Sequence, residues 1–195
     1  MRDFMDAYLA LWAFIVAMVA TPGPANMLLM TAGAQQGYVR TLPFIGGLLA
    51  GKLALNLALA FGLMQIIDAN PDIKSVFVFV SAAYMAYLAL RNWTPPSASS
   101  SQSRFSFWAG AIVHPLSPKT WMMATLALSQ FAHGFVTDLE RMLVVPISFL
   151  AVQLCFHSVW CLAGAALSRA LDQNLVVHRA LILLTLGVIV WAVLQ

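Results

Sequence analysis

The sequence predicts an all-α integral membrane protein with six transmembrane helices, arranged as two inverted repeats of three helices each. Composition, the length of the apolar segments and a pair of proline motifs lead to this prediction. Of the 195 residues, 62% are hydrophobic and 9% are charged, whereas an average soluble domain has about 25% charged residues. The chain therefore consists mainly of apolar segments joined by short polar ones.

Six segments are long enough to cross a bilayer as a helix, which takes about 20 apolar residues. They cover residues 7–32, 42–67, 72–91, 107–132, 142–168 and 175–194. Together they leave no soluble domain in which an enzyme active site could form, so we expect no catalysis, no cofactor and no metal site. The net charge of +3 is small and scattered over the loops, which argues against nucleic-acid binding.

Proline motifs interrupt the first and fourth spans at corresponding places: TPGPAN at 21–26 and HPLSPK at 114–119. Proline has no N–H and clashes with the preceding turn, so each motif should break its helix and leave carbonyls without helical partners. In a membrane such backbone is tolerated where it packs in protein or lines a cavity. Matching breaks in two halves indicate a transporter's binding site near the midplane, although two ordinary kinks satisfied by neighbours are the alternative. The candidate substrate-binding or translocation residues here are Pro22, Gly23, Pro24, Asn26, His114, Pro115, Ser117, Pro118 and Lys119.

The second span carries a buried charge. Lys52 lies in its middle with no acid nearby in sequence, and an ionisable group there costs at least about 2.5–3.5 kcal/mol unless it faces the bundle interior or a cavity. Asn56 follows one turn later on the same face, so both join the candidate site, with snorkelling of the lysine as the alternative. Pro43 is expected in the first turn of this span, and Gly47 and Gly51 should let another helix approach closely.

The fifth span places Gln153 and His157 at helical spacing on one face, so both are further candidates for the site. A histidine that only packs and forms a hydrogen bond is the alternative. Cys155 and Cys161 lie on the same predicted helix, about 9 Å of rise apart. A disulfide between them would require that helix to unwind, and we interpret both as small apolar side chains.

A Pro/Ser-rich stretch, Thr94 to Arg104, divides the chain into two halves and should be a loop. We therefore expect a first three-helix repeat at 1–91, a linker at 92–106 and a second three-helix repeat at 107–195. Because each half has an odd number of spans, the second is inverted relative to the first. Five Lys/Arg residues fall on the linker side of the spans and three on the other, which predicts a cytoplasmic linker and both termini outside.

The absence of acids inside the spans restricts the ligand. No Asp or Glu lies well inside any span, which argues against a sodium site or a proton relay built on carboxylates. Broken helices offer backbone donors at one end and carbonyls at the other, and this pair of groups suits a zwitterion. Its carboxylate would meet donors at Ala25 and Asn26, aided by Lys52 or Lys119, while its ammonium would meet carbonyls before the prolines. A neutral amino acid fits better than a dication.

These motifs resemble those of the LysE/RhtB family of amino-acid exporters, with a Pro-Gly-Pro-Asn-Asn type motif in the first span and Asn-Pro-Lys in the fourth. The chain differs at Ala25 and Ser117, where that family has Asn, and at Lys52, where many members have Asp after Gly. Residues 107–109 and 127–131 are similar to the cysteine/O-acetylserine exporter branch. The resemblance implies a multi-pass secondary transporter of the bacterial cytoplasmic (inner) membrane. It would export a small neutral amino acid or derivative by alternating access, with that substrate and the lipid bilayer as partners.

Two other functions remain as alternatives. One is a channel-like or structural membrane subunit without a substrate cycle. The other is a membrane thiol-redox protein, which would need cysteines beside the proline motifs, where this chain has Ala, Asn and Ser. Six short spans enclose little interior, so a homodimer is a plausible assembly.

Overall fold

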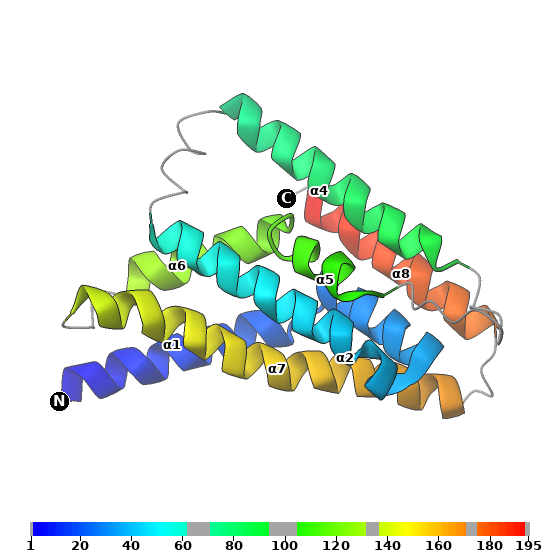
Figure 1. Cartoon of the computed structure of the whole chain (residues 1–195), viewed down its shortest axis with the longest axis horizontal. Coiled ribbons are helices and arrows are strands. Elements are labelled where there is room, and N and C mark those ends of the chain that lie inside the picture. Colours follow the sequence, from blue (N-terminus) through cyan, green and yellow to red (C-terminus); the bar gives the residue numbers. More distant parts are fainter. Residues whose placement is uncertain (1, 62–70, 94–104, 132–136, 171–174, 194–195) are drawn as a thin grey trace.

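The computed structural model describes residues 2–61, 71–93, 105–131, 137–170 and 175–193. All regular structure in these ranges is helical, which confirms the all-α class, and the longer helices lie side by side along the long axis of the molecule (Figure 1). The helices are α1 (Arg2–Ala20), α2 (Pro24–Ala60), α4 (Pro71–Arg91), α5 (Phe107–Val113), α6 (Pro118–Phe131), α7 (Asp138–Ala170) and α8 (Leu175–Val193).

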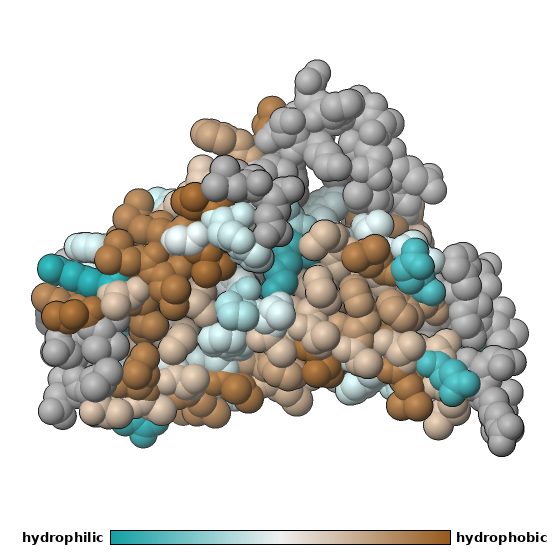
Figure 2. All heavy atoms as spheres, turned by 180° about the vertical axis from the view of Figure 1, so that it is seen from behind, coloured by the Kyte–Doolittle hydropathy of each residue, from teal (hydrophilic) through white to brown (hydrophobic). Residues whose placement is uncertain are grey.

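Among the described residues, two helices have the length and composition of membrane spans. α2 and residues Leu143–Ala170 of α7 are long and apolar enough to cross a bilayer, and Met5–Ala20 and Arg179–Trp191 are shorter apolar helices. Large apolar side chains are exposed on the outer helix faces, among them Leu9, Phe79, Trp108 and Trp191. Brown and tan residues accordingly cover most of the described face in Figure 2. Apolar surface of this extent suits contact with hydrocarbon.

Both proline motifs end one helix and begin another, as predicted. α1 ends at Ala20 and α2 begins at Pro24, while α5 ends at Val113 and α6 begins at Pro118. Proline suits the first helical position because the N–H that it lacks would have no helical acceptor there. We refer to residues 21–23 as the first break and to residues 114–117 as the second break.

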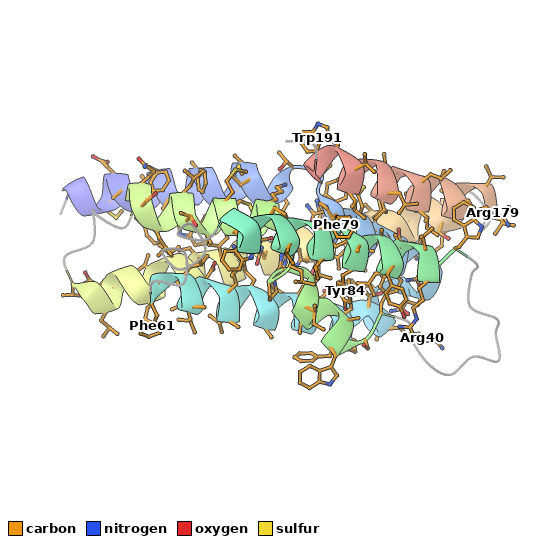
Figure 3. The ribbon with its side chains drawn as sticks, turned by 90° about the horizontal axis from the view of Figure 1, so that it is seen from above. Arg40, Phe61, Phe79, Tyr84, Arg179 and Trp191 are labelled. Atoms are coloured by element: carbon orange, nitrogen blue, oxygen red, sulfur yellow. The ribbon has the colours of Figure 1, made fainter. Side chains whose placement is uncertain are left out.

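A third interruption lies within α2, at Gly37, whose φ of 76° and ψ of 172° are not helical. Glycine adopts positive φ at little cost, so it can redirect the chain between the predicted first and second spans. Figure 3 shows the result: Arg40 lies at one end of the bundle and Phe61 at the other. Pro43 lies inside the helix instead of in the first turn of a new one, because the glycine redirects the chain first.

Small residues bring α2 and α5 into backbone contact. A Cβ added at Gly47 or Gly51 would collide with the backbone of Phe107 or Ala111, so the predicted close approach at this glycine pair is confirmed. Beside it, Phe44 packs edge-on against Phe105 with ring centroids 5.1 Å apart. α2 also packs along α7 and α8.

Candidate functional site

A pocket with about 320 Å³ of empty space, including its open mouth, lies where the two breaks meet. Its lining comes from the end of α1, both breaks, the first turns of α2 and α6, and the middle of α7. The lining residues are Met18, Val19, Gly23, Pro24, Ala25, Asn26, His114, Ser117, Lys119, Thr120, Met123, Gln153 and His157. Segments about 90 residues apart in sequence therefore form one site.

The structure brings together most of the residues predicted for the site. Eight of them line the pocket: Gly23, Pro24, Asn26, His114, Ser117, Lys119, Gln153 and His157. Five do not: Pro22, Lys52, Asn56, Pro115 and Pro118. Sequence reasoning missed Met18, Val19, Thr120 and Met123, which lie within about two helical turns of a break. That spacing along α1 and α6 is the signal that could have found them.

The first break is satisfied by a side chain. The Asn26 side-chain amide donates to the Val19 carbonyl at 2.9 Å and to the Thr21 carbonyl at 3.0 Å. Asn26 is 6% exposed, so these are hydrogen bonds in a largely dry environment, where an unmet donor or acceptor is costly. The expectation that these carbonyls stand open is therefore corrected, because the motif's own asparagine already occupies them.

The second break is satisfied mainly by its own backbone. The Ser117 N–H donates to the His114 carbonyl at 3.1 Å, and the Ser117 carbonyl accepts from Thr120 N–H at 2.9 Å and Trp121 N–H at 3.2 Å. The Trp121 indole N–H adds a bond of 2.6 Å to the Pro115 carbonyl. These bonds make the second break a tight turn whose geometry depends on local residues.

One side chain connects the two breaks. The Lys119 ammonium donates to the Thr21 hydroxyl at 2.7 Å and to the Thr21 carbonyl at 3.2 Å. The Thr21 hydroxyl in turn donates to the Met18 carbonyl at 2.7 Å, which orients its lone pairs toward the lysine. A Cβ added at Gly23 would lie 3.2 Å from Lys119 Nζ, so this glycine leaves room for the ammonium. Lys119 thus joins residues 98 apart in the chain.

Lys52 lies beside the pocket without lining it. Its side chain is fully buried, so it does not snorkel to an interface. Nζ donates to the Thr120 carbonyl at 3.3 Å and lies 3.9 Å from the centroid of the Phe149 ring, a distance at which the ring face attracts a cation. Asn56 is also fully buried, and its side-chain nitrogen and oxygen have no hydrogen-bond partner among the described residues.

Two histidines stack inside the pocket. The rings of His114 and His157 have centroids 5.4 Å apart and an angle of 14° between their planes. His114 Nδ1 is 3.1 Å from the Thr120 hydroxyl. His114 Nε2, His157 Nδ1 and Gln153 Oε1 are buried and have no hydrogen-bond partner within the described ranges. Each such atom costs about 1–3 kcal/mol when unsatisfied, so the pocket wall is adapted to a polar ligand. Those ranges contain no group of three or more His, Cys, Asp or Glu placed to hold a metal.

The fold and site are those of an all-helical protein with apolar, span-length helices and a small pocket between broken helices, as expected of a membrane translocator. The chain belongs to the LysE type translocator family, which it matches over residues 16–193, and the predicted family resemblance is confirmed. Members of this family are transporters of the inner membrane that export amino acids, and they are not enzymes.

The chain is similar to two efflux proteins of this kind. The cysteine/O-acetylserine efflux protein of Salmonella typhimurium (strain LT2) is 26% identical over 163 residues, which are 83% of this chain and 84% of the relative. The protein of the same description from Escherichia coli (strain K12) is 24% identical over 166 residues, 84% of this chain and 85% of the relative. No solved structure matches the chain.

Proposed function

We propose that this protein exports a small neutral amino acid or amino-acid derivative across the bacterial cytoplasmic membrane by alternating access. The observation that carries the proposal is one pocket lined by both proline breaks. Three of its lining residues carry buried polar atoms without partners among the described residues: Gln153 Oε1, His114 Nε2 and His157 Nδ1. Such a wall suits a ligand that both donates and accepts hydrogen bonds, as an amino acid does.

The charge of the pocket restricts the substrate class. The lining contains Lys119 and no acidic side chain, an arrangement that favours one carboxylate over a second cationic group. The two similar efflux proteins export cysteine or O-acetylserine, as their names state, and both compounds are small and neutral overall.

We propose six spans in two inverted repeats, 1–91 and 107–195, joined by a cytoplasmic linker. α1 with the part of α2 before Gly37 would form the first span, and α5 with α6 the fourth, so that each repeat begins with a broken helix. This assignment is supported by the matching position of the two breaks, one in each half of the chain.

The distribution of arginines supports an orientation with this linker inside and both termini outside. Arg40 and Arg179 lie at one end of the bundle, opposite Phe61 (Figure 3). The Arg179 guanidinium is 5.5 Å from the centroid of the Trp93 ring, so the end of α4 and the start of α8 meet at that same end. Positive residues favour the cytoplasmic side.

Export can be measured as uptake into inverted membrane vesicles, with a panel of labelled amino acids and O-acetylserine, with and without a proton gradient. We expect saturable uptake of at least one small neutral substrate. Gln153→Leu, which removes the buried acceptor at similar volume, should lower that uptake at least about tenfold. Arg40→Gln, exposed and outside the pocket lining, is the matched control and should leave uptake unchanged.

Two outcomes would overturn the proposal. Failure of every neutral substrate in vesicles that contain the protein would exclude the substrate class. Flux that never saturates with substrate would favour the channel-like alternative. The thiol-redox alternative predicts that Cys155→Ala with Cys161→Ala abolishes function, whereas neither cysteine lines the pocket and we expect the double variant to transport.

A further inference from the structure

The first break already binds a primary ammonium group, that of Lys119. Its Nζ lies 2.7 Å from the Thr21 hydroxyl and 3.2 Å from the Thr21 carbonyl, distances typical of charge-assisted hydrogen bonds or slightly longer. The bonds that hold Thr21 in position do not come from the lysine: Asn26 donates to its carbonyl and its own hydroxyl donates to Met18. The two acceptors are therefore oriented whether or not Lys119 is in place.

A further acceptor belongs to the pocket that Lys119 lines. Gln153 Oε1 is buried in a side chain that is 1% exposed, and it has no partner among the described residues. Thr21 is exposed and does not line the pocket, whereas Lys119 and Gln153 do. Thr21 therefore lies beside the pocket, where its two oxygens accept two of the three N–H donors of the Lys119 ammonium.

We infer that the Thr21 carbonyl and hydroxyl form the subsite for the primary ammonium of the substrate, and that Lys119 occupies it as an internal substitute. This inference rests on the proposed function and names the part of the site that recognises the amino group. An incoming ammonium displaces that of Lys119.

Displacement of the Lys119 ammonium also leaves a binding group for the carboxylate of the substrate. Once displaced, the Lys119 ammonium has no acidic side chain in the pocket lining to pair with. The substrate brings a carboxylate into the same small space, and a lysine ammonium binds a carboxylate through a charge-assisted hydrogen bond. The hydrogen bonds from Lys119 to Thr21, which connect the two breaks, are thereby lost when the substrate binds. The substrate ammonium is then bound by the first break and its carboxylate by Lys119 of the second motif.

The inference is tested by rescue of the Lys119→Met variant with a small ammonium. This substitution keeps most of the length of the side chain and removes the charge. In purified protein in detergent, methylammonium chloride should raise the Tm of the variant by about 2–4 °C. Tetramethylammonium, which has the same charge and no N–H donor, should not. The wild type should respond less to methylammonium, because its own lysine competes for Thr21.

Equal Tm shifts with methylammonium and tetramethylammonium would overturn the inference, as would equal shifts in the wild type and in Lys119→Met. Arg40→Met, which removes an exposed cation outside the pocket lining, is the matched control and should behave as wild type. If this variant gained the same methylammonium response as Lys119→Met, the effect would be a general one of lost positive charge, and the subsite would be refuted.

A second measurement uses substrate selectivity. Thr21→Val removes the hydroxyl and keeps the carbonyl, so it should weaken binding of a transported amino acid at least about fivefold and leave competition by its α-hydroxy acid analogue unchanged. Equal effects on both compounds would contradict an ammonium subsite at Thr21. The rescue experiment needs no transport assay, so its failure would refute only this subsite, whereas failure of the vesicle panel would refute the proposed function.

Discussion

The two breaks are similar in sequence and differ in how their carbonyls are satisfied. At the first break the hydrogen-bond donors are side chains. Asn26 donates to the Val19 and Thr21 carbonyls, and Lys119, from the other half of the chain, also donates to the Thr21 carbonyl. At the second break the donors are the backbone N–H groups of Ser117 and Thr120, which bind carbonyls a few residues away in the chain. A side-chain donor can rotate away and be replaced by a ligand, whereas a backbone donor can leave only if the helix unwinds. The first break is thus suited to bind, and the second to position Lys119 and His114.

The largest expected effect comes from the side chain that holds the first break. Asn26→Ala removes the donor to the Val19 carbonyl and leaves Thr21 with Lys119 alone, at a cost of about 1–3 kcal/mol for a buried group that loses its partner. We expect a clear fall in Tm and loss of transport. Thr185→Val is the control: its hydroxyl is buried and bonds within α8, away from the pocket. An equal loss of transport in both variants would contradict a special role for Asn26.

A smaller effect is expected from filling the space that the lysine uses. Gly23→Ala places a Cβ 3.2 Å from Lys119 Nζ, so the ammonium must shift by a few tenths of an ångström. We expect weaker substrate exchange with a Tm within about 1–2 °C of wild type. Gly46→Ala, whose Cβ would lie 3.8 Å from the Phe107 ring, is the matched glycine control. If both variants transport equally well, the position of the lysine is not important for the exchange.

The second break should tolerate the loss of a side-chain donor. Trp121→Phe removes the indole N–H bond to the Pro115 carbonyl, while the bonds to the Ser117 carbonyl remain. We expect a loss of about 1 kcal/mol in stability, measured by thermal unfolding, and transport within about twofold of wild type. A loss of transport as large as that of Asn26→Ala would remove the distinction between the two breaks.

A small effect on substrate binding is also expected at Lys52. It does not line the pocket, and its ammonium contacts the Thr120 carbonyl and the Phe149 ring. Lys52→Met should leave the substrate Kd within about threefold of wild type, as measured by ligand-induced shifts in Tm. A rise in Kd beyond tenfold would show that Lys52 binds the substrate carboxylate after all, as the sequence alone suggested.

Much of the fold and of the candidate site could be predicted from local chemistry. Proline cannot continue a helix, so both breaks follow directly from the sequence, and Lys52 had to be buried because of its central position in an apolar segment. Two features could not be predicted. Gly37 takes a positive φ that many glycines never adopt, and the contact of Lys119 with Thr21 joins residues 98 apart. Both depend on how the helices pack, which no single segment encodes.

The glycine contact between α2 and α5 has a consequence for movement. At Gly47, Gly51 and Gly110 the two backbones touch, and there is no space for even a methyl group. These helices belong to different halves of the chain, so a side chain at any of the three positions would push the halves apart at this point. Rotation about this contact would keep the two backbones together. We therefore expect the glycines to act as the pivot of the transport cycle, with the largest displacements at the far side of the pocket, where α1 meets α6.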